Sequence, residues 1–151
     1  MEMKNLCRDE LIEFLDSILK YKPVFDERVS GDGSVWIPDE TRYDIDNIGH
    51  RYVGYDYTYV NAARRIWEVV EKYHLQDFEY PQNIKIIQDK YEIKNLKQIS
   101  EKKLDLFEII TILTFIERYD RHADGCVYEH YVEDGTFYNL LCRLEEIRGE
   151  L

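Results

Sequence analysis

The chain has 151 residues, of which 44% are apolar and 14% aromatic, so it is long enough to bury one core and unlike a disordered segment. Acidic residues outnumber basic ones by 31 to 20, and the formal net charge of −11 repels phosphate backbones and anionic lipids. The composition predicts a single domain over residues 1–151 with no direct nucleic-acid partner and no membrane partner, and it favours a basic protein partner.

The cysteines and the apolar runs indicate a cellular compartment. Cys7, Cys126 and Cys142 are odd in number and form no CxxC pair, which is typical of free thiols in a reducing environment. The first residues mix acids with bases and lack the apolar run of a secretory leader. The most apolar stretch, residues 104–116, is too short to span a bilayer. The sequence therefore predicts a cytoplasmic protein.

Residues 2–20 predict an amphipathic helix that ends before Pro23. Leu11, Phe14, Leu15 and Ile18 recur at the spacing of one helix face. Residues 24–57 lose this pattern and hold four of the seven glycines, so we expect a long irregular loop region there, with a short hairpin near residues 30–34. The alternation of tyrosines at positions 55, 57 and 59 predicts a short extended piece before the next helix.

Helical periodicity governs the rest of the chain. Thr58 or Asn61 is a suitable cap for a helix that ends near His74. Residues 84–93 favour a helix over a strand, and a final amphipathic helix follows Asp134 and Gly135. Between them, nine of the thirteen residues 104–116 are apolar, and their polar positions wind around the axis, as in a buried helix. The prediction is a mainly α, compact helical domain of about five to six helices around a central hydrophobic helix.

A dense polar cluster follows the predicted central helix. Arginines held by carboxylates commonly grip phosphate or carboxylate groups. The cluster therefore supplies candidate ligand-binding residues, namely Arg118, Asp120, Arg121, His122 and Asp124. The alternative is an ion-pair network, including Glu117, that ends the helix with Gly125 as its stop.

Metal and catalytic motifs are weak. His122, Cys126 and His130 recur every four residues with zinc-ligand chemistry, but Gly125 is predicted to break the helix between them. An EF-hand placed on Asp44 lacks its fifth and twelfth ligands. The sequence contains no Walker loop, dinucleotide fingerprint or GxSxG motif. We predict no metal, no cofactor and no catalytic residue, and the sequence favours a protein that is not an enzyme.

Tyrosines and acids mix in the loop region. Tyrosine offers a large contact area at low entropic cost, and acids among such anchors suit a basic groove on a partner. The candidate partner-binding residues are Trp36, Asp44, Asp46, Tyr52, Tyr55 and Tyr57. The alternative is that these aromatic residues cover the core.

The run Arg118-Tyr119-Asp120-Arg121-His122-Ala123-Asp124-Gly125, followed by Gly135 and by Leu140, Leu141, Arg143 and Leu144, resembles a family of small uncharacterised bacterial and phage proteins. Its members show an Arg-x-Glu-Arg-Phe-x-x-Gly stretch after a hydrophobic helix and a Leu-x-Arg-Leu ending. Here Asp120 replaces the Glu and His122 replaces the Phe. This domain of unknown function implies a helical fold and a bacterial or phage source, but no activity.

Two function hypotheses follow. The first is an uncharacterised acidic binding protein, such as a phage or bacterial inhibitor, that occupies a basic, nucleic-acid-handling surface of a protein partner. The alternative is a small-molecule binding protein or enzyme that holds a nucleotide-like anion through Arg118, Arg121 and His122. These side chains should line a concave pocket in the second case and pair with neighbouring acids in the first. The pattern does not encode the partner, the ligand or the oligomeric state.

Overall fold

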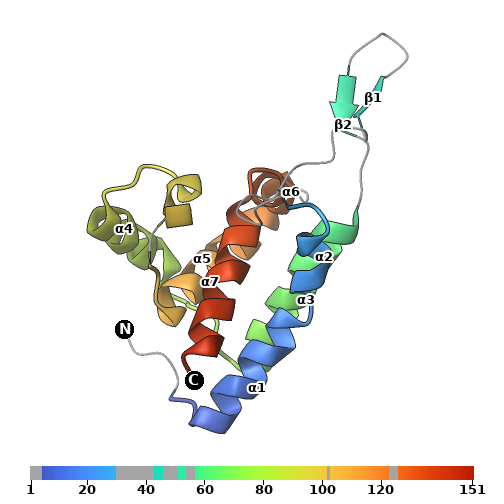
Figure 1. Cartoon of the computed structure of the whole chain (residues 1–151). Helices are drawn as coiled ribbons and strands as arrows, with labels where there is room; N and C mark the ends of the chain where they lie inside the picture. Colours follow the sequence, from blue (N-terminus) through green and yellow to red (C-terminus); the bar gives the residue numbers. More distant parts are fainter. Residues whose placement is uncertain (1–4, 30–42, 46–50, 54–56, 102, 123–125) are drawn as a thin grey trace.

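The computed structural model describes residues 5–29, 43–45, 51–53, 57–101, 103–122 and 126–151, and it confirms the prediction of a mainly helical domain (Figure 1). Its helices are α1 (Arg8–Leu19), α2 (Lys22–Asp26), α3 (Tyr57–Lys72), α4 (Tyr80–Tyr91), the 3-10 helix η2 (Leu96–Glu101), α5 (Leu106–Asp120), α6 (Cys126–Glu133) and α7 (Thr136–Gly149). Two short strands, β1 (Tyr43–Ile45) and β2 (Arg51–Val53), pair antiparallel. Figure 1 shows this hairpin projecting beyond the helices.

Helix α5 is the predicted central helix. Its residues from Glu108 to Thr114 are all buried, and it packs against α3, α4, α6 and α7. The helix begins with a capping box, in which the Asp105 carboxylate accepts from the Glu108 N–H at 2.7 Å and the Glu108 carboxylate accepts from the Asp105 N–H at 2.9 Å. Asp105 and Glu108 therefore satisfy backbone groups at the start of the helix, whereas Thr111 and Thr114 are buried within it.

Helix α1 ends before Pro23, as predicted, but two other local predictions near residues 20–60 were wrong. The start of the predicted irregular region is helical, because Pro23 lies in the first turn of α2, where its missing N–H costs nothing. Helix α3 begins at Tyr57, and Tyr59 is buried and contacts Phe25 at a ring distance of 5.9 Å. The spacing of Tyr59, Ala63 and Ile66 continues the helical period, which outweighs the alternation of three tyrosines.

The predicted hairpin near residues 30–34 lies outside the described residues. The hairpin that the structure does describe joins residues 43–45 to 51–53, with Tyr43 opposite Val53. The predicted irregular region thus contains the short helix α2 at its start and this hairpin further on.

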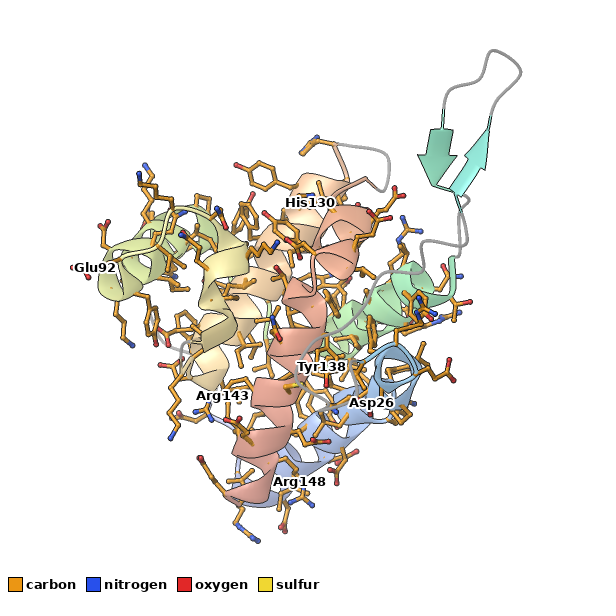
Figure 2. The ribbon with its side chains drawn as sticks, turned by 45° about the horizontal axis from the view of Figure 1, so that its top comes forward. Asp26, Glu92, His130, Tyr138, Arg143 and Arg148 are labelled. Carbon is orange, nitrogen blue, oxygen red and sulfur yellow. The ribbon has the colours of Figure 1, made fainter. Side chains whose placement is uncertain are left out.

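Helix α7 packs against α1, and in the view of Figure 1 it stands between α4 on the left and α1 at the lower right. Arg148 Nε of α7 lies 2.8 Å from Asp16 Oδ1 of α1, and Figure 2 shows Arg148 at the far end of α7 from Tyr138. Arg8 donates to the backbone carbonyl of Leu151, so the start of α1 meets the end of the chain. These two contacts fix α1 against α7 and the end of the chain.

Candidate functional site

Asp120, from the predicted ligand cluster, is buried and holds three helices together. Its Oδ1 accepts from the Tyr128 N–H at 3.1 Å, which satisfies a free donor in the first turn of α6. Its Oδ2 lies 3.6 Å from Arg64 of α3. Burial and a hydrogen bond to Glu117 raise the pKa of Tyr128, so its hydroxyl remains a donor. These contacts give Asp120 and its neighbours a role in joining α3, α5 and α6.

The other cluster residues are more exposed. Arg121 Nε lies 3.4 Å from Glu117 Oε1, one helical turn away. Arg118 is half-buried and His122 is exposed, and neither forms an ion pair with another residue in the described ranges. Asp124 lies outside those ranges. The contacts of Asp120 and Arg121 are those expected of an ion-pair network at a helix end.

The predicted partner-binding residues fall mostly where the structure gives no description. Trp36, Asp46 and Tyr55 lie outside the described residues. Asp44 and Tyr52 stand directly opposite each other in the β1–β2 pair, and Tyr57 is the first residue of α3. The hairpin therefore brings one acid and one tyrosine of the predicted set to the same place.

A buried polar network, which the sequence did not reveal, fixes α4 against α5. The Asp77 carboxylate is 2% exposed and accepts from Thr111 Oγ1 at 2.7 Å and from Asn83 Nδ2 at 2.9 Å. It also accepts from the Glu79 N–H at 2.9 Å, and the Asp77 N–H donates to Thr114 Oγ1 at 3.1 Å. Because Asp77, Asn83, Thr111 and Thr114 are buried, this network positions the start of α4.

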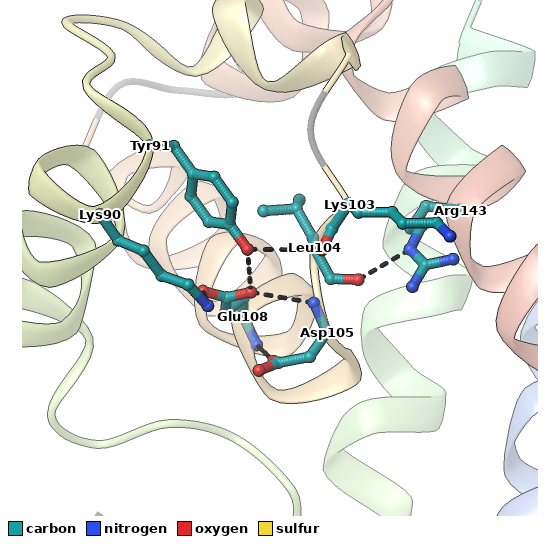
Figure 3. A network of polar contacts seen from close by, with 7 residues as sticks. All are labelled: Lys90, Tyr91, Lys103, Leu104, Asp105, Glu108 and Arg143. Atoms are coloured by element: carbon teal, nitrogen blue, oxygen red, sulfur yellow. Dashed lines mark hydrogen bonds and ion pairs between the residues drawn. The ribbon is translucent and has the colours of Figure 1, made fainter.

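A second network lies at the other end of the α4–α5 pair (Figure 3). The Glu108 carboxylate accepts from the Tyr91 hydroxyl at 2.6 Å and lies 3.0 Å from Lys90 Nζ, in addition to its capping bond with Asp105. Burial alone would raise the pKa of Glu108, but these donors outweigh it and lower the pKa. Beside this network, Arg143 Nε of α7 donates to the Leu104 carbonyl at 2.8 Å.

A groove of about 400 Å³ opens between α4, η2, α5 and α6, and we call it the α4–α5–α6 groove. Its walls combine aromatic rings with amide and ammonium groups. They are formed by Tyr80, Pro81, Ile84, Lys85, Gln88, Lys94, Asn95, Leu96, Phe115, Tyr119 and Tyr131. Arg118, Arg121 and His122 are not part of these walls.

Four aromatic rings meet along one wall of the groove. Phe115 contacts Tyr119 at a centroid distance of 4.4 Å, Tyr131 at 6.4 Å and Tyr80 at 6.5 Å. Phe115 and Tyr119 are four residues apart on α5, which was visible in the sequence, but Tyr80 and Tyr131 come from other helices. Sequence reasoning missed this wall because its rings are distant along the chain.

The described residues contain neither a cluster of metal ligands nor a helix that could span a membrane. His130 Nε2 lies 3.8 Å from Asp134 Oδ2, but within the described ranges no three His, Cys, Asp or Glu side chains gather closely enough to hold a metal ion. None of the helices in those ranges combines the length and apolar character needed to cross a bilayer.

No family model, curated protein or solved structure matches the chain significantly. The resemblance of residues 118–125 to a family of unknown function therefore stays a prediction.

Proposed function

We propose that the protein is a non-enzymatic binding protein whose acidic surface occupies a basic surface on a protein partner of the class that handles nucleic acid. The observation that carries this proposal is the net charge of −11 in a folded domain where, among the described residues, some acidic residues pair with lysine or arginine and others, on α1, do not. Surfaces that bind nucleic acid are basic, so they attract an acidic protein through the same field.

The first turns of α1 carry the acids that best fit this role, and we call Asp9, Glu10 and Glu13 the α1 acidic surface. All three are exposed, and none forms an ion pair with a lysine or arginine in the part of the chain that the structure describes. Helix α1 contains four acids and one base. The fourth acid, Asp16, is paired with Arg148.

The neighbouring end of α3 adds an aromatic residue to this surface. Tyr73 packs edge-on against Phe14 of α1 at 5.3 Å. Burial, a hydrogen bond with Glu13 and the charges of Glu13 and Glu10 raise the pKa of Tyr73. Lys72 Nζ lies 6.0 Å from the Tyr73 ring centre and offsets part of that negative charge.

Some of the acids elsewhere in the described residues are balanced locally. On α7 and α2, Glu145 lies 3.6 Å from Lys22, and Glu146 lies 2.9 Å from Arg143. Helix α4 holds two lysines and one acid. The α1 acidic surface is therefore better suited than these regions to attract a basic partner.

Salt-dependent binding tests the proposal. Purified nucleic-acid-binding proteins would be titrated with the chain in biolayer interferometry at rising salt, because screening weakens attraction between exposed charges. We expect binding that falls with salt and an association rate that drops in the triple variant Asp9→Asn, Glu10→Gln, Glu13→Gln.

A matched control removes the same number of exposed charges from another region. It is the triple variant Glu79→Gln, Asp89→Asn, Glu92→Gln, at the ends and on the outer face of α4. We expect it to slow association less than the α1 triple variant does. Complexes indifferent to salt, an absence of binding, or equal effects of the two triple variants would contradict the proposal.

The alternative hypothesis, an anion held by Arg118, Arg121 and His122, has less support. Arg121 is engaged with Glu117, and the three side chains do not line the α4–α5–α6 groove. The acidic binding protein is therefore the function that we propose.

A further inference from the structure

We infer that the α4–α5–α6 groove is a binding site for a nucleoside monophosphate, with the base against the aromatic wall and the phosphate at the lysines. The site is independent of the α1 acidic surface, because α1 contributes no residue to the groove. The inference therefore goes beyond the proposed function and can fail or succeed separately.

The charge of the groove is opposite to that of the chain. Among the residues that the structure describes, its walls include Lys85 and Lys94 and no carboxylate, whereas the whole chain carries a net charge of −11. Both lysines are exposed, and neither forms an ion pair with any residue in the described ranges. Two ammonium groups at the rim can each donate to a phosphate oxygen without first breaking a salt bridge.

The aromatic wall suits a planar ring. Tyr119 is 52% exposed although it contacts Phe115 at 4.4 Å, so one side of its ring is free to stack with a ligand. Every nucleobase has a π-face, and stacking on an aromatic side chain is a common source of base affinity. The hydroxyls of Tyr80, Tyr119 and Tyr131 donate to no partner among the described residues and can reach polar atoms of a base or sugar.

The groove follows the axis of α4. Tyr80, Ile84 and Gln88 follow one face of this helix over roughly 12 Å, at a rise of about 1.5 Å per residue. Tyr80 contacts Phe115 at one end, and Gln88 Nε2 donates to the Lys94 carbonyl at 3.2 Å at the other. Tyr80 and Lys94 therefore lie at opposite ends of this face, as the base and phosphate of a nucleotide do, and Lys85 lies along α4 between them.

Size and rigidity agree with a small ligand. A volume of about 400 Å³ falls in the range of small-molecule sites. The Asp77 network holds the aromatic end, and the Glu108 network holds the other end of the α4–α5 pair. Walls that are held in place lose little entropy when a ligand binds. A longer nucleic acid is disfavoured, because its many phosphates would meet the negative field of the rest of the chain.

Isothermal titration of the full chain with AMP, GMP, CMP and UMP tests the inference, with adenosine and inorganic phosphate as partial ligands. We expect at least one nucleotide to bind more tightly than either partial ligand. Tyr119→Ala should weaken binding about tenfold, the value expected for one lost stacking contact. Lys94→Ala should weaken it severalfold and reduce its salt dependence.

Matched controls separate the groove from general surface effects. Phe78→Ala removes a ring that is 76% exposed and outside the groove, and Lys97→Ala removes an exposed lysine of η2 that does not line it. Both should leave nucleotide affinity unchanged, as should the triple variant of the α1 acidic surface. Circular dichroism would verify that Tyr119→Ala and Lys94→Ala remain folded.

Several outcomes would overturn the inference. These are no binding of any of the four nucleotides at about 1 mM, adenosine binding as tightly as AMP, or equal losses in the groove variants and their controls. Displacement of a nucleotide by an acidic aromatic peptide that binds far more tightly would also overturn it, since the groove would then be a peptide site.

Discussion

Replacing Asp77 with alanine should strongly destabilise the fold, because it removes the acceptor of a buried network. Thr111 Oγ1 at 2.7 Å and Asn83 Nδ2 at 2.9 Å would each lose a partner in a dry environment, whereas the Glu79 N–H is partly accessible to water. Removing the acceptor of a buried donor costs about 1–3 kcal/mol, so the two losses together give about 2–6 kcal/mol. This is a large share of the stability of an ordinary domain and corresponds to a fall of roughly 10 °C in melting temperature.

Urea unfolding followed by far-UV circular dichroism measures this loss directly. Asp89→Ala is the matched control, since Asp89 is an exposed acid on α4, and it should change the free energy of unfolding by less than about 0.5 kcal/mol. Asp77→Asn keeps one carbonyl acceptor and should fall between wild type and Asp77→Ala. A loss below about 1 kcal/mol in Asp77→Ala, or an equal loss in the control, would refute the view that this network fixes α4 against α5.

The remaining predictions concern Glu108, the end of α5 and the thiols. The pKa of folded Glu108 lies below its ordinary value of 4.5, so its stabilising effect is complete above that pH and is lost as the pH falls through the folded pKa. In urea unfolding at neutral pH, the free energy of unfolding of Glu108→Gln should thus be about 1–2 kcal/mol lower than that of wild type. This difference should shrink in acid, and a difference independent of pH would contradict the prediction. Asp120→Ala should lower the melting temperature by several degrees in scanning fluorimetry and Arg121→Ala hardly at all, whereas equal shifts would argue against a structural role for Asp120. In mass-spectrometric iodoacetamide labelling, exposed Cys7 should react faster than Cys142, because burial raises the pKa of the Cys142 thiol; the reverse order would show that the α7 face opens.

The sequence predicted the helices well where the apolar period was long. Residues 104–116 identified α5, and the pairing of Glu117 with Arg121 followed from their spacing of four on one helix. The capping box of Asp105 and Glu108 was not identified from the sequence, although the chain places this acceptor and this carboxylate three residues apart. Local patterns of this kind depend only on helix geometry, so one sequence is enough to find them.

Contacts between distant segments could not be predicted in this way. Asp120 meets Arg64 of α3, and Asp77 meets Thr111 of α5, through packing that no local period specifies. The aromatic wall of the groove has the same origin, because Tyr80 joins Phe115 only after α4 folds back along α5. The polar cluster that the sequence offered as a candidate ligand site was conspicuous because its charges are adjacent along the chain. Adjacent opposite charges, however, tend to satisfy one another.

Salt dependence should separate the two proposed binding surfaces, because their charges act over different ranges. The α1 acidic surface belongs to a domain of net charge −11, so it attracts a basic partner over distances at which salt screens strongly. A nucleotide in the groove meets that same field as a repulsion on approach, and it is held by Lys85 and Lys94 only at contact. Added salt screens both the repulsion by the net charge and the attraction by the two lysines, so its two effects on nucleotide affinity are opposite and partly cancel. Partner association should therefore fall steeply with salt, while nucleotide affinity should fall only slightly.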